Sequence, residues 1–154
     1  MKRSGFYIGV YLLVWNVVFL SSVDLPWILM EGAPFSHFDP SAHWYSDGNL
    51  PVSFFFSFAA CILTGVLFVC LWLVRKLRYG DYLWLVGVVI SSFLVGSLLG
   101  RMLAEFSWGM GHEFEHSSPP LKDLVAWSLP PLLASLASGC LVGGCLLPSR
   151  QADT

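Results

Sequence analysis

The sequence predicts an all-α integral membrane protein with four transmembrane helices and both termini in the cytoplasm. Four apolar stretches are each close to the ~20 residues that a helix needs to cross a hydrocarbon core of ~30 Å. Basic residues gather on one side of these stretches, and aromatic residues mark their ends. The mean hydropathy of +0.69 and the 12% of charged residues agree, because about a quarter of the residues in a soluble domain are charged.

The predicted spans make up a single domain, 1–154. They cover residues 5–23, 52–74, 82–103 and 124–147. A secretory signal peptide is the competing interpretation of the first span, because Met-Lys-Arg precedes an apolar run. The run is long for a signal sequence and no A-x-A-like cleavage site follows Leu20, so we predict a retained helix.

Charges beside the spans predict the orientation. Six of the eight basic residues would share one side: Lys2, Arg3, Arg75, Lys76, Arg78 and Arg150. That side is the cytoplasm by the positive-inside rule, here of a bacterial-type plasma (inner) membrane. The net charge of −2 and the absence of a polybasic tract give no reason to expect a nucleic acid as partner.

The sequence repeats itself at a distance of 79 residues. The pattern G-x-x-F-x-H-x-x-P occurs at 32–40 and again at 111–119, whereas the first and third spans align only weakly in this register. The same shift superposes Cys61 on Cys140 and Gly65 on Gly144. We therefore predict two tandem hairpins, 5–74 and 82–147, related by an axis along the membrane normal. The alternative is that two apolar hairpins coincide by composition.

Small residues predict how the helices pack. Gly96-x-x-x-Gly100 lies in the third span and Gly139-x-x-x-Gly143 in the fourth. Glycines four residues apart let two helix backbones approach closely where no hydrophobic effect drives the helices together. Close packing of the third span on the fourth is the favoured use of these glycines, and dimerisation of the chain is the alternative.

The fourth span also contains two prolines, Pro130 and Pro131, which should kink the helix or mark a late start of its regular part. Uncharged polar residues inside the spans are few, namely Asn16, Thr64, Ser91 and Ser92. No ionisable residue lies near the middle of a span, which weighs against an ion or proton pathway. Arg101 is expected to pair with Glu105 one turn further on.

All four histidines lie in the predicted outer loops: His37, His43, His112 and His116. Residues 112–116 satisfy both H-E-x-x-H and H-x-x-E-H, but glycines before them and prolines after them leave barely one helical turn, which disfavours zinc-peptidase chemistry. The predicted repeat makes His37 and His116 equivalent, so a zinc or copper site of three or four ligands is chemically reasonable. The competing interpretation is that these imidazoles bond to backbone groups or contact a partner.

Two hypotheses about function follow. The first is an accessory or binding subunit without catalytic activity, which contacts membrane lipid and either a membrane-protein partner or a second copy of the chain. Its contacts would be the aromatic outer loops and the Gly-rich faces of the third and fourth spans. The second is a metal- or cofactor-binding membrane protein that uses the loop histidines. Metal analysis of the purified protein separates the two.

Overall fold

The computed structural model describes residues 2–32, 49–77, 81–111 and 119–146, and every element among them is a helix. The elements are α1 (Lys2–Ser22), α2 (Leu25–Glu31), α4 (Asn49–Leu77), α5 (Asp81–Gly111) and α6 (Leu121–Cys145). Four helices are long and apolar enough to cross a membrane, the first of them being α1 together with α2. The predicted all-α class with four such helices is thereby confirmed.

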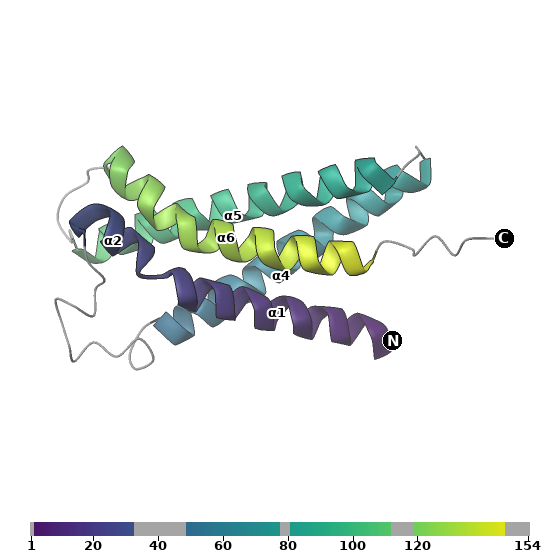
Figure 1. Ribbon diagram of the computed structural model, residues 1–154, viewed down its shortest axis with the longest axis horizontal. Helices are drawn as coiled ribbons and strands as arrows, with labels where there is room; N and C mark the ends of the chain where they lie inside the picture. Colours follow the sequence, from purple (N-terminus) through teal and green to yellow (C-terminus); the bar gives the residue numbers. More distant parts are fainter. Residues whose placement is uncertain (1, 33–48, 78–80, 112–118, 147–154) are drawn as a thin grey trace.

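The four long helices run side by side, as Figure 1 shows. The start of α1, the junction of α4 with α5, and the end of α6 lie at one end of the bundle, and α2 lies at the other. The most extensive contact is between α5 and α6; α1 packs on α6, and α4 packs on both α5 and α1. Because the start of α1 and the end of α6 lie at the same end, this arrangement is consistent with an even number of membrane crossings.

The short helix α2 follows α1 after a break at Val23 and Asp24. Pro26 fits the first turn of α2, where its missing N–H breaks no helical hydrogen bond. Gly32 ends α2 with a φ of 77°, a left-handed conformation that glycine adopts without steric cost, and its N–H donates to the carbonyl of Ile28 at 3.0 Å. Residues 25–31 fall in the first predicted outer loop, which is expected to lie on the bilayer surface or to cap the bundle, and they are helical.

Helix α2 packs against the beginning of α6. The rings of Trp27 and Trp127 meet edge to face, with centroids 6.1 Å apart. Lys122 Nζ donates to the carbonyl of Met30 at 3.2 Å. These contacts hold α2 over the bundle, at the end away from the α4–α5 junction.

Large apolar side chains lie both inside the bundle and on its surface. The core contains Tyr11, Trp15 and Phe19 of α1, all under 4% exposed. Many other large apolar residues are more than half exposed, for example Leu13 and Ile62. A continuous apolar exterior of this kind suits contact with lipid tails, because soluble proteins rarely expose large apolar patches.

Helix α6 runs as a regular helix from Leu121 through Pro130 and Pro131, and both prolines are fully buried. The helix thus begins before the prolines, so of the two expectations the late start is wrong and the kink stays a prediction. The carbonyls that these prolines leave without an intrahelical donor are those of Ala126 and Trp127, one turn earlier. Burial within the bundle is the setting in which such a break in the hydrogen-bond ladder is tolerated.

Burial patterns bear unevenly on the predicted repeat. In the register of 79 residues, α4 and α6 bury equivalent positions, for example Ala60 and Gly139. Helices α1 and α5 do not match in that register, because Trp15 is buried whereas Leu94 is exposed. The repeat and the cytoplasmic location of the termini stay predictions.

Candidate functional site

The predicted metal ligands His37, His43, His112 and His116 lie outside the described residues. Among the residues that the structure does describe, no three His, Cys, Asp or Glu side chains come together in a group that could hold a metal ion. The possible zinc or copper site therefore stays a prediction from the sequence.

Two glycines of α5, Gly96 and Gly100, face the backbone of α6. A Cβ on Gly96 would lie 2.7 Å from the Cα of Leu132, and a Cβ on Gly100 would lie 2.7 Å from the Cα of Ser128. Real Cβ atoms essentially never approach another atom so closely. At these two positions the α5 and α6 backbones therefore touch with no room for a side chain.

Two glycines of α6, Gly139 and Gly143, in turn face side chains of α5. A Cβ on Gly139 would lie 2.9 Å from the Cβ of Ser92, and a Cβ on Gly143 would lie 2.7 Å from a methyl carbon of Val88. Gly96 and Gly100 thus receive the backbone of α6, and Gly139 and Gly143 receive side chains of α5. All four glycines lie in contacts within the chain.

Helix α1 makes polar contacts with both of its neighbours. Trp15 Nε1 donates to Ser135 Oγ on α6 at 3.1 Å, and both side chains are fully buried. The hydroxyls of Tyr11 and Thr64, on α1 and α4, share a hydrogen bond of 2.9 Å. In an apolar surrounding such bonds fix the relative rotation of the helices, because an unpaired donor there is costly.

The remaining polar positions show no chain of ionisable groups. Ser53 Oγ donates to Asn16 Oδ1, and Asn16 Nδ2 donates to the carbonyl of Leu12 at 2.8 Å. Ser91 and Ser92 are buried, and Ser92 Oγ has no hydrogen-bond partner among the described residues. At the end of the bundle where α2 lies, the predicted pair of Arg101 and Glu105 is confirmed, with Nε and Oε1 at 3.0 Å. These contacts are structural in form, since each hydrogen bond joins helices or stays within one turn.

An apolar groove lies along the outside of α1 and α4. Its volume is about 380 Å³. One wall consists of Tyr7, Ile8, Tyr11 and Leu12 of α1, and the other includes Phe58, Cys61, Ile62 and Gly65 of α4. Gly65 is exposed, and a Cβ there would meet nothing within 4 Å. The sequence alone did not predict this groove, and its one local signal is Gly65 in the middle of an apolar span.

The fold and these contacts define a class: an all-helical bundle with helices able to span a membrane, tied together by glycine contacts and buried hydrogen bonds. The described residues contain no group of His, Cys, Asp and Glu side chains that could hold a metal ion. No family model, curated protein or solved structure matches the chain.

Proposed function

We propose that this chain is a small membrane protein that acts as an accessory subunit, without catalytic activity of its own, and binds a membrane-protein partner through one face of its bundle. The observation that carries the proposal is the groove between α1 and α4 with its open glycine at Gly65. In a lipid bilayer, helices associate by close packing at small residues. The hydrophobic effect does not favour another helix over a lipid tail as a neighbour, because both are apolar.

The division of the glycines supports this choice of face. Four glycines already contact neighbouring helices of the same chain: Gly96, Gly100, Gly139 and Gly143. The partner surface is therefore proposed on a different face from the Gly-rich faces predicted from the sequence. Gly5 and Gly9 on α1 have the same spacing as those pairs, are exposed, and meet nothing within 4 Å at their Cβ positions.

Gly5 and Gly9 also lie beside the groove. Residues three or four apart share a helix face, which places both glycines next to Ile8 and Leu12 of the groove wall. The partner-binding face thus combines a furrow with small residues that let a second helix approach. The unequal burial of the spans agrees: 28% of the apolar windows of α1 and α4 is buried, against 44% for α5 and α6.

A matched pair of variants tests the face. We expect Gly65→Leu to weaken partner association at least about fivefold, because leucine fills the place where the partner helix would pack. Gly144→Leu, an equally open and exposed glycine on α6, should leave association unchanged. The measurement is quantitative mass spectrometry of the complex isolated in mild detergent from native membranes, with the mass of the intact particle to identify self-association. A wild-type chain isolated as a lone monomer would contradict the proposal.

We also propose that both termini face the cytoplasm of a bacterial-type plasma membrane, since Arg75, Lys76 and Arg78 follow one span and Lys2 and Arg3 precede another. Reporter fusions after Arg78 and after Thr154 should report a cytoplasmic location. Fusions within 35–48 or 110–120 should report the outside. A cytoplasmic signal from 110–120 would overturn the four-span topology.

The alternative, a metal- or cofactor-binding membrane protein, depends on histidines outside the described residues and gains no support from the helices. It predicts that metal remains with the purified protein and is lost on replacing His37 or His116 by alanine.

A further inference from the structure

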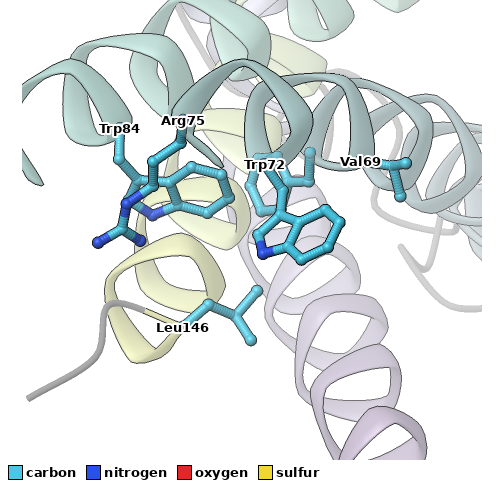
Figure 2. A pocket seen from close by; sticks show the side chains of 6 residues that line it. Val69, Trp72, Arg75, Trp84 and Leu146 are labelled. Atoms are coloured by element: carbon cyan, nitrogen blue, oxygen red, sulfur yellow. The ribbon is translucent and has the colours of Figure 1, made fainter. Parts of the chain in front are cut away.

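A second cavity lies at the end of the bundle where α4 meets α5, and it shares Phe68 with the lining of the α1–α4 groove. Its volume is about 450 Å³, within the range of small-ligand sites. Its lining consists of Phe68, Val69, Trp72, Arg75, Trp84 and Leu146. Figure 2 shows Arg75 and Trp84 at one side of the cavity, Val69 at the other, and Trp72 between them.

Arg75 is the charged residue of this lining, and two contacts hold its guanidinium group. It forms an ion pair with Asp81, the first residue of α5, and its guanidinium carbon lies 5.8 Å from the centroid of the Trp84 ring. The Trp84 indole is fixed in turn, because its Nε1 donates to the carbonyl of Gly143 at 3.2 Å. A guanidinium carries several N–H donors in a rigid fork, so Arg75 can bind Asp81 and a phosphate at the same time.

The charge of the sequence next to Arg75 favours an anionic ligand. Residues 75–81 contain Arg75, Lys76 and Arg78 against the single acid Asp81, a net charge of +2. The Arg75 side chain is 24% exposed, whereas that of Arg101, in the second half of α5, is 69% exposed. The positive charge of Arg75 is thus partly shielded from solvent. At such a position the attraction to an anion is stronger than at an open surface, because water screens it less.

The rest of the cavity favours an apolar tail. Val69 and Phe68 precede Arg75 on α4 by about two helical turns, which separates them from Arg75 by ~10 Å along the helix axis. Val69 and Trp72 are each more than half exposed, so this side of the cavity opens onto the lipid-facing surface. Tryptophans at such a boundary are typical of the membrane–water interface. A ligand with a charged head and an apolar chain therefore matches both ends.

We propose that this cavity binds an anionic glycerophospholipid, with its phosphate on the Arg75 guanidinium and an acyl chain over Trp72 and Val69. Basic pockets between transmembrane helices at the cytoplasmic side are a known form of lipid headgroup site. The cavity shares Phe68 with the partner face, but Arg75 and Val69 line the cavity alone and Gly65 lines the groove alone, so variants at these positions test the two proposals separately.

Lipid binding to the full chain in neutral detergent, measured by native mass spectrometry, tests the proposal. Phosphatidylglycerol should bind more tightly than phosphatidylcholine, and Arg75→Gln should weaken phosphatidylglycerol binding about fivefold to tenfold. Arg101→Gln is the matched control: Arg101 is also paired with a carboxylate, Glu105, but does not line the cavity. It should leave lipid binding unchanged. Asp81→Asn should strengthen binding, because it removes the carboxylate that competes for the guanidinium.

A second variant keeps the test independent of the charge. Val69→Trp should fill the apolar side of the cavity and exclude the acyl chain with every charge in place, and it serves also if Arg75→Gln does not fold. Equal losses with Arg75→Gln and Arg101→Gln would show a general charge effect and overturn the site. Unchanged binding in Arg75→Gln or in Val69→Trp would overturn it as well. Binding of glycerol 3-phosphate as tight as that of the lipid would show a small-phosphate site and overturn the lipid.

Discussion

Replacing Gly96 by leucine will destabilise the bundle by about 3 kcal/mol or more. The new side chain would begin with a Cβ 2.7 Å from the Cα of Leu132 and 3.2 Å from the carbonyl oxygen of Pro131. Both neighbours are backbone atoms of α6, so no side-chain rotation at these two atoms can make room. Helices α5 and α6 must therefore move apart, although their contact is the most extensive in the bundle. The dispersion attraction between them is then lost.

Reversible unfolding in mixed micelles with rising dodecyl sulfate, followed by circular dichroism, measures this loss. Gly109→Leu is the control on the same helix, because Gly109 is exposed and its Cβ position meets nothing within 4 Å. It should be neutral or slightly stabilising, since leucine favours a helix more than glycine does. Gly87→Ala should fall in between, because its new Cβ meets only the flexible end of the Leu71 side chain. If Gly96→Leu were as stable as Gly109→Leu, close backbone packing would not hold α5 to α6.

Hydropathy was enough to predict four helices able to span a membrane. It predicted less accurately where each helix ends. The third predicted span stops at residue 103, whereas α5 continues to Gly111. The last turns contain Glu105 and Trp108, which lower the hydropathy but do not interrupt a helix, because helical hydrogen bonds do not depend on apolar side chains. The end of the apolar run therefore does not mark the end of the helix.

The sequence favoured close packing of the third and fourth spans at their glycines, but it could not show that the glycines of α1 stay open. Gly5 and Gly9 have the same spacing as Gly96 and Gly100, yet the first pair meets open space and the second pair meets a backbone. Spacing shows that a helix face is smooth, and the positions of the other helices decide whether that face is covered.

The Arg75 cavity escaped prediction for a similar reason. Arg75, Trp72 and Trp84 were recognisable as an interfacial set from their places at the ends of spans. Their convergence on one cavity with Leu146 depends on how α6 meets α4 and α5. Contacts between distant parts of a chain leave no local pattern in its sequence.

Replacing Trp15 by alanine should cost about 4 kcal/mol of stability, for a different reason from the glycine variant. Trp15 is fully buried, and its ring stacks on that of Phe19 with centroids 5.0 Å apart and an angle of 13° between the planes. Alanine would leave a cavity where α1 meets α6 and would remove the donor that Ser135 accepts. A close-packed core loses both the contacts and the transfer free energy of the deleted ring.

A double-mutant cycle separates the hydrogen bond from the packing. Trp15→Phe keeps an aromatic ring but has no N–H, and Ser135→Ala leaves the indole N–H buried without its acceptor. The coupling between these two changes should be about 1 kcal/mol, the usual range for interhelical hydrogen bonds in membranes. Leu13→Ala, a truncation on the exposed side of the same helix, should cost far less than Trp15→Ala in the same micelle titration. Equal losses for Leu13→Ala and Trp15→Ala would mean that α1 does not bury this face, and the packing of α1 on α6 would have to be abandoned.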